Sequence, residues 1–226
     1  MSRDQVLVHL ADMVAATDVS VNADFESGFA RDSNAVAESV ALAVQTGVAG
    51  LSIEDPTGMP ENPLFDVDIA VERIRVARRA NDANGGDTLL VGRAECFLVG
   101  RPDLDETIGR LKAYANAGAD CLYAPGLRTR EQICAVVDAV APKPVNLLVG
   151  WASDLTLADI AALGVRRVSV GGALARAAWG GFMRAARLLA DEGRFDGFAD
   201  AAKGTELDAF FRADQQRSDP RKTNPS

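Results

Sequence analysis

One pattern recurs three times in this chain: a helical stretch is followed by a glycine and then by a short apolar run. The three copies read AVQTGVAGLSIE, AYANAGADCLYAPG and AALGVRRVSVGG, and their glycines are Gly47, Gly118 and Gly164. A glycine just past a helix accepts the left-handed conformation that ends the helix. The apolar run that follows is typical of a strand buried on both faces, and therefore of a parallel sheet. The pattern predicts an α/β fold built from repeated strand–helix units.

The hydrophobic periodicity predicts six strands separated by helices. We expect strands at about Val19–Asp24, Ala49–Glu54, Thr88–Glu95, Cys121–Ala124, Pro144–Val149 and Arg167–Val170. We expect helices at about Asp4–Ala16, Asn34–Gln45, Val67–Asn84, Leu104–Ala117, Thr129–Val140, Leu157–Leu163 and Ala173–Glu192. A closed (β/α)₈ barrel needs two more strands, so the fold is either a barrel that is incomplete or a doubly wound sheet. Residues 1–214 are expected to form a single domain, and residues 215–226 a disordered polar tail.

Composition argues against several classes of function. The net charge of −8 gives an acidic surface that repels phosphate backbones, so we expect no nucleic-acid partner. No apolar run reaches the roughly 18 residues of a membrane span, and the N-terminus lacks the features of a signal peptide. Cys96, Cys121 and Cys134 lie in apolar segments at no zinc-site spacing, which indicates reduced, buried thiols. We therefore expect a cytoplasmic protein that does not bind membranes.

Charged side chains gather at the predicted carboxyl ends of the strands, where α/β barrels place their working residues. Asp24 and Glu26 follow the first strand two residues apart, Glu54 ends the second strand, and Arg93 ends the third. Converging carboxylates repel one another unless a cation lies among them, and all-oxygen ligands suit Mg²⁺ or Mn²⁺. Arg93 would hold an anionic substrate by a two-point contact. The alternative is that each acidic residue is only a helix N-cap or an ion-pair partner.

The order of these motifs resembles that of the isocitrate lyase/phosphoenolpyruvate mutase superfamily. In that family a strand ending D-x-D/E-x-G-Y/F is followed by a strand ending I-E-D, as in the run VSVNADFESGFARDSNAVAESVALAVQTGVAGLSIEDPTG. Further matches are LLVGRAECFLVGRPDLDETIGRLKAYANAGADCLYAPGL and PVNLLVG. The resemblance runs from about Asp4 to Phe211 and favours the oxaloacetate decarboxylase/dimethylmalate lyase-like branch.

The resemblance implies a TIM-type (β/α)₈ barrel with C-terminal helices, and a role for each matching residue. Asp24 matches the carboxylate that binds Mg²⁺ directly, while Glu26 and Glu54 match those that hold it through water. Arg93 matches the arginine that grips the carboxylate or phosphonate of the substrate, and we count Arg93 and Glu54 as catalytic. The implied substrate-binding residues are Arg93, Asn146 and Gly28.

The implied reaction makes or breaks a C–C or P–C bond next to a 2-oxo acid, through an enolate stabilised by Mg²⁺. The implied substrate is a small anionic 2-oxo acid or hydroxy-dicarboxylate, with oxaloacetate or an alkylmalate preferred. Members of the family are typically homotetramers that exchange the last barrel helix between subunits. Ala173–Glu192 is the candidate for that helix here.

Two departures from the family pattern qualify this reading. Isocitrate and methylisocitrate lyases carry a Lys-Lys/Arg-Cys-Gly-His loop after the I-E-D strand, but Pro56–Leu64 contains no Cys, Lys or His. The family's first two strands would precede Met1, so we expect a barrel incomplete at its N-terminus, with about six βα units, and roughly 50–70 further residues encoded upstream. One alternative is an inactive family member that acts as a subunit or partner of a full-length relative. Another is a phosphate-binding barrel, which would rest on Gly171 and Gly172.

Overall fold

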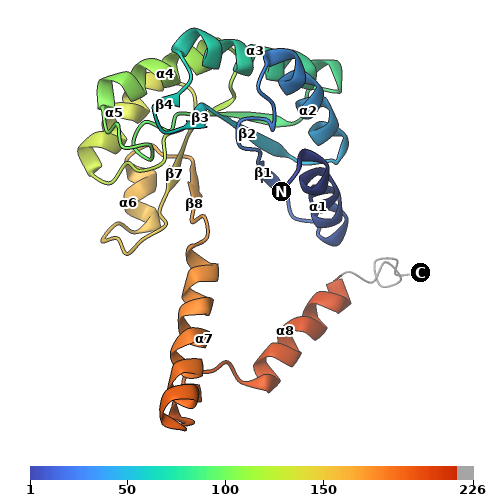
Figure 1. Ribbon diagram of the computed structural model, residues 1–226, viewed down its shortest axis with the longest axis vertical. Coiled ribbons are helices and arrows are strands. Elements are labelled where there is room, and N and C mark those ends of the chain that lie inside the picture. The colour runs from blue at the N-terminus through green and yellow to red at the C-terminus, as the bar shows by residue number, and fades with distance from the viewer. Residues whose placement is uncertain (218–226) are drawn as a thin grey trace. The chain divides into compact units, whose positions relative to one another are not determined.

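Six parallel strands form one curled, open sheet in the order β1-β2-β5-β6-β7-β8, with helices along its outer face (Figure 1). The computed structural model describes residues 1–217. β1 and β8 are the two edges of the sheet, so the predicted arrangement of six parallel strands alternating with helices is confirmed. The strands are β1 (Asn22–Asp24), β2 (Gly50–Glu54), β5 (Leu89–Arg93), β6 (Cys121–Tyr123), β7 (Val145–Leu148) and β8 (Arg167–Ser169).

The predicted helices are confirmed within one or two residues. The glycines of the repeated pattern have positive φ, as predicted for residues that end helices: 85° at Gly47, 109° at Gly118 and 89° at Gly164. The side chain of Asp32 accepts a bond from the N–H of Ala35 and so caps α2. The helices of this part are α1 (Arg3–Ala16), α2 (Ser33–Gln45), α3 (Val67–Ala83), α4 (Leu104–Asn116), α5 (Arg130–Val140) and α6 (Leu157–Ala162). No helix within residues 1–217 is long and apolar enough to cross a membrane.

A short antiparallel hairpin, β3 (Pro56–Met59) and β4 (Asn62–Leu64), interrupts the alternation after β2. This segment, Pro56–Leu64, was expected to be a loop, by its match to the loop that follows the I-E-D strand in the family. The hydroxyl of Thr57 donates to the carbonyl of Asn62 across the hairpin. The hairpin therefore extends from the carboxyl end of β2, the same end of the sheet at which Glu54 lies.

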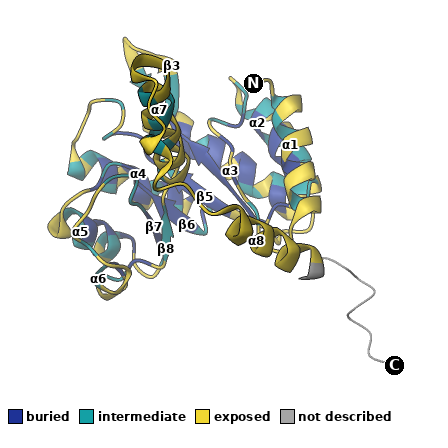
Figure 2. Cartoon of the chain, turned by 90° about the horizontal axis from the view of Figure 1, so that it is seen from below, coloured by how far each residue is buried: buried dark blue, intermediate teal, exposed yellow. Residues whose placement is uncertain are grey.

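The two faces of the sheet carry different chemistry. Side chains such as Leu51, Ile53, Leu90 and Leu147 belong to the main apolar core with the surrounding helices, and Figure 2 shows the strands as the most buried part of this unit. Because neighbours along a strand point to opposite faces, the residues between them line the inner, concave face. That face carries Ser52, Glu54, Val91, Arg93, Cys121, Tyr123, Asn146 and Leu148. The polar residues of this face form the candidate site.

The chain divides into two units, Met1–Gly171 and the part from Gly172 onward. The second unit contains α7 (Ala173–Glu192), a 3₁₀ turn (Asp196–Phe198) and α8 (Gly204–Arg217). α7 has the predicted bounds and ends at Gly193, which has a φ of 66°. α8 was not predicted, and it includes residues 215–217 of the expected tail. The rest of that tail, 218–226, lies outside the described residues.

Candidate active site

Arg93, the last residue of β5, is the centre of an ion-pair cluster. Its Nη1 lies 2.8 Å from Oε1 of Glu54 and 3.2 Å from each carboxylate oxygen of Asp24. Its Nε donates to Oε1 of Glu95, and its guanidinium carbon lies 4.9 Å from the ring centroid of Tyr123. These residues meet because β1, β2, β5 and β6 are neighbours in the sheet and end at the same edge.

The pKa values of Glu54 and Asp24 are shifted in opposite directions. Burial, together with the hydrogen bond to Asp24, raises the pKa of Glu54 to about 9. Burial acts in the same direction on Asp24, but the hydrogen bond from Glu54 and the charge of Arg93 outweigh it, so the pKa of Asp24 lies below its ordinary value. At neutral pH these shifts keep Glu54 protonated and Asp24 ionised. Burial also raises the pKa of Glu95, against the opposing charge of Arg93.

The donor set formed by Asp24 and Glu54 fits a hydrated divalent cation. The side chain of Asp24 is 68% exposed, whereas that of Glu54 is 9% exposed, so the pair is open to solvent on one side only. The hydroxyl of Ser52 lies 3.4 Å from Oδ1 of Asp24 and adds a third oxygen. Mg²⁺ keeps several waters and is commonly bound by one or two carboxylates. No group of three or more His, Cys, Asp or Glu side chains within residues 1–217 is arranged to hold a metal ion by itself.

Glu26 does not join this cluster. The prediction placed Asp24 and Glu26 on the same side because it assumed extended backbone at both, but β1 ends at Asp24. Glu26 has a φ of 48°, in the left-handed region, so the alternation of an extended strand no longer applies to it. Its side chain is exposed, and its main-chain carbonyl accepts a bond from the N–H of Glu54 at 2.9 Å. The expected set of three carboxylates is thus present as a pair.

Asn146 and Gly28, the other expected substrate contacts, lie apart from the carboxylates. Asn146 is fully buried on β7; its Nδ2 donates to Oγ of Ser169 at 3.0 Å, and its Oδ1 has no hydrogen-bond partner. Such an orphaned acceptor facing the inside of the sheet suits a water or a hydroxyl of a substrate. Gly28 is buried with a φ of 76°, and an added Cβ would lie 3.3 Å from Cγ1 of Val36. Gly28 is therefore needed for the turn after β1.

Three residues of the cluster, Glu95, Tyr123 and Ser52, were absent from the predicted site. Tyr123 and Ser52 lie on the inner face of their strands, and a signal was available, since Ser52 lies two residues before Glu54 on β2. Asp55, the neighbour of Glu54, is 2% exposed and bonds to side chains of α4 rather than to the side chains of the cluster. Nothing in the local sequence separates it from its neighbour Glu54, because the difference depends on which helix packs outside β2.

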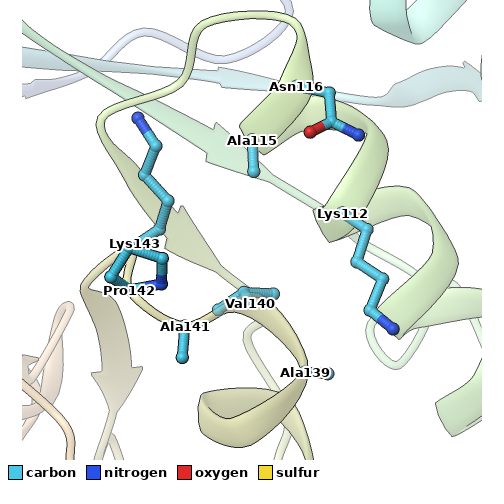
Figure 3. Close-up of a pocket in the computed structure, with 8 residues that line it drawn as sticks. All are labelled: Lys112, Ala115, Asn116, Ala139, Val140, Ala141, Pro142 and Lys143. Carbon is cyan, nitrogen blue, oxygen red and sulfur yellow. The ribbon is translucent and has the colours of Figure 1, made fainter.

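One cavity adjoins the site at Asp24, and another lies at the far end of the sheet. A cavity of about 450 Å³ beside β1 is lined by Asp24 and Glu26 together with apolar residues of α1 such as Leu10 and Met13. Another, of about 360 Å³, lies between the C-terminal ends of α4 and α5, at the opposite end of the sheet. Figure 3 shows that the side chains of Lys112 and Lys143 in that second cavity point in different directions. The first cavity is therefore the one that Asp24 of the cluster lines.

Comparison with known proteins identifies the family. A family model described as phosphoenolpyruvate phosphomutase matches residues 1–190. The chain belongs to this family. The predicted resemblance is confirmed, and the curated relatives of this phosphoenolpyruvate phosphomutase-family chain include lyases.

Three relatives show how similar the chain is to known proteins. A solved structure of a provisionally named lyase/mutase from Burkholderia cenocepacia J2315 is 47% identical, with a TM-score of 0.88, and covers 93% of this chain and 76% of that one. An uncharacterized protein of Mycobacterium tuberculosis is 30% identical over 81% of this chain and 67% of its own length. The oxaloacetate decarboxylase of Paraburkholderia xenovorans is 33% identical over 72% of this chain. The match spans only 54% of that decarboxylase.

Proposed function

We propose that this chain is a Mg²⁺-dependent lyase that breaks a C–C bond next to a 2-oxo group, with oxaloacetate or a substituted malate as substrate. The observation that carries the proposal is the Arg93 cluster, in which one guanidinium and two neighbouring carboxylates meet beside a cavity. Buried ion pairs of this kind rarely stabilise a fold by themselves. The similarity to an oxaloacetate decarboxylase supports the choice of substrate. Mn²⁺ is an equivalent ion for this donor set.

The residues would act as follows. Asp24 and Glu54 would hold the cation, Asp24 directly and Glu54 through water. A bound cation would supply a Lewis acid that polarises the 2-oxo group and stabilises the enolate oxygen. Because the cation would replace the guanidinium as the counter-charge of both carboxylates, Arg93 would become free to bind the substrate carboxylate. In oxaloacetate the C3–C4 bond breaks, CO₂ leaves, and the electron pair forms the enolate, which takes a proton from solvent at C3 to give pyruvate.

A substrate screen by NMR tests this proposal. Oxaloacetate, alkylmalates, methylisocitrate and phosphonopyruvate would each be followed with and without Mg²⁺, against a protein-free sample, since Mg²⁺ alone accelerates loss of CO₂ from oxaloacetate. We expect Mg²⁺-dependent turnover of oxaloacetate or an alkylmalate. Asp24→Asn should abolish both turnover and Mn²⁺ binding measured by calorimetry. Mn²⁺ affinity unchanged in a folded Asp24→Asn protein would contradict the metal assignment.

A second candidate function is that of an inactive subunit or partner of a full-length relative. It is favoured by the open edge of the sheet at β1 and by the exposure of Asp24 beside that edge. The same screen separates the two functions. A protein that binds Mn²⁺ but converts none of the compounds would support the partner function.

We also propose that the chain forms a homotetramer in the cytoplasm, with α7 exchanged between subunits. No residue of α7 is buried, and it exposes Leu174, Trp179, Phe182 and Met183, of which Trp179 and Phe182 stack edge to face at 5.5 Å. Apolar side chains of this size are seldom left in water unless another chain covers them. Light scattering on wild type and on Phe182→Glu measures the assembly, and a tetramer that persists in Phe182→Glu would argue against exchange through this face.

A further inference from the structure

The loop that follows β1 has an unusual backbone. Glu26 and Phe29 have φ values of 48° and 53°, although neither is a glycine, and Gly28 between them has a φ of 76°. The N–H of Gly28 bonds the carbonyl of Phe25 at 2.9 Å to close the turn. Two non-glycine residues with left-handed backbone within a segment of four residues persist only where surrounding contacts fix that backbone.

The side chain of Arg73 on α3 fixes the second half of this loop. Arg73 is 1% exposed, and its guanidinium donates to three main-chain carbonyls: those of Ser27, of Ala30 at 2.8 Å and of Arg31 at 3.0 Å. Its guanidinium carbon lies 4.5 Å from the ring centroid of Phe65. Its Nε has no hydrogen-bond partner. The charge is therefore balanced by carbonyl dipoles of the loop.

Burying a guanidinium without a carboxylate partner is costly. Asp32, which acts on Arg73 through its charge, uses its own carboxylate to cap α2. The other end of the loop is tied by the bond from the N–H of Glu54 to the carbonyl of Glu26. The loop is thus held between β2, which carries the site, and Arg73, which lies outside it.

We propose that Arg73 is a positioning residue for the divalent-cation site. It fixes the loop that begins at the end of β1, and so fixes the direction in which Asp24 faces Glu54. Arg73 itself touches neither carboxylate. This inference rests on the proposed function, because it concerns the same cation site.

The test compares Mn²⁺ binding by calorimetry in wild type, Arg73→Met and Arg78→Met. Arg78 is a matched control: it lies on the same helix, its Nε also lacks a partner, and it pairs with Asp82 at 2.6 Å and Asp120 at 3.0 Å, away from the loop. We expect Arg73→Met to raise the Kd for Mn²⁺ about tenfold or more, as loss of a supporting contact does at other metal sites. Arg78→Met should leave the Kd within about threefold of wild type even where it lowers the melting temperature, because its side chain does not support the loop.

Arg73→Lys keeps the positive charge but replaces the planar guanidinium, which can donate to several carbonyls at once, with a single ammonium group. It should bind Mn²⁺ more weakly than wild type and more tightly than Arg73→Met, and it serves alone if Arg73→Met does not fold. Wild-type affinity in a folded Arg73→Met, or in Arg73→Lys where only that variant folds, would overturn the positioning role. So would an equal loss of affinity in Arg78→Met. Absence of Mn²⁺ binding in wild type would instead overturn the proposed function, and this inference with it.

Discussion

The phenolic oxygen of Tyr114 lies 2.6 Å from Oδ2 of Asp55, and this bond ties α4 to the end of β2. The same carboxylate accepts bonds from Nη1 of Arg110 at 3.2 Å and from the N–H of Glu95 at 2.8 Å. Arg110 also donates to the main-chain carbonyl of Phe65. The main-chain N–H of Phe65 in turn donates to the main-chain carbonyl of Asp55. A single buried carboxylate therefore fixes both ends of the β3–β4 hairpin and the main chain just after β5.

This network predicts a large loss of stability on mutation of Asp55. Asp55→Ala should lower the free energy of unfolding by about 3–5 kcal/mol, because it leaves the buried guanidinium of Arg110 without this partner. Tyr114→Phe removes one hydrogen bond and should lower it by about 1–2 kcal/mol. Urea unfolding followed by circular dichroism measures both. Losses in the reverse order, with Tyr114→Phe the more damaging, would mean that Asp55 is not the centre of the network.

Much of the fold could be predicted because each signal was local. The helix–glycine–strand pattern located three of the strands, and other short apolar runs located the rest. The ends of the strands were predicted too long, since residues such as Val19 and Val149 continue the apolar pattern beyond the last ladder pair. α8 and the β3–β4 hairpin were missed because one has a mixed polar and aromatic face and the other contains prolines.

Part of the candidate site could be predicted because the order of the strands was known. Asp24, Glu54 and Arg93 could be brought together because parallel strands place their ends at one edge of the sheet. The position of Glu26 could not be predicted, because Glu26 has a left-handed φ. The loop that contains it is supported by Arg73, which lies on α3, some 47 residues further along the chain. Likewise, the structural role of Asp55 depends on Tyr114 and Arg110 of α4. Contacts between distant elements have no signature in the local sequence.

Substitution of Arg93 should reduce turnover by removing the two-point contact with the substrate. Arg93→Lys keeps the positive charge but cannot form the planar fork, so kcat/KM should fall by about two to three decades. Tyr123→Phe is a matched control, since it keeps the ring that packs against the guanidinium. Near-normal turnover in Arg93→Lys, measured with the best substrate of the screen, would show that another residue binds the anion.

The raised pKa of Glu54 predicts a pH dependence of stability in the metal-free protein. The pKa of Glu54 is raised from 4.5 to about 9 in the folded protein. A group with a raised folded pKa contributes stability that is complete below the unfolded value and is lost as the pH rises through the folded value. The metal-free protein should therefore lose stability between pH 5 and about 9, and Glu54→Gln should flatten this slope. Thermal unfolding across that range, with EDTA present, measures the effect; equal slopes in both proteins would exclude Glu54 as the source.

Binding of Mg²⁺ should release the proton of Glu54, because the charge of the cation and its bound waters favour the ionised form of Glu54. Calorimetry at pH 7 in two buffers that differ in ionisation enthalpy measures the protons released per ion bound. Wild type should release a fraction approaching one proton. Glu54→Gln should bind more weakly and release none, and release unchanged in that variant would place the proton on another group.

The last prediction concerns the β3–β4 hairpin and the choice of substrate. Cleavage of isocitrate or methylisocitrate requires an acid that protonates the departing succinate carbanion, and the hairpin offers no thiol, lysine or histidine at Pro56–Leu64. Its single ionisable side chain, Glu61, is exposed at the tip, and no hydrogen bond or ion pair within residues 1–217 fixes its carboxylate toward the site. Both tricarboxylates should therefore be poor substrates, while oxaloacetate, whose enolate can be protonated by water, should be converted. Glu61→Gln should leave oxaloacetate turnover within about twofold of wild type, because an exposed carboxylate that makes no fixed contact contributes little. NMR detection of succinate from either tricarboxylate at a rate comparable to pyruvate formation would refute the argument, and loss of that succinate in Glu61→Gln would identify the acid.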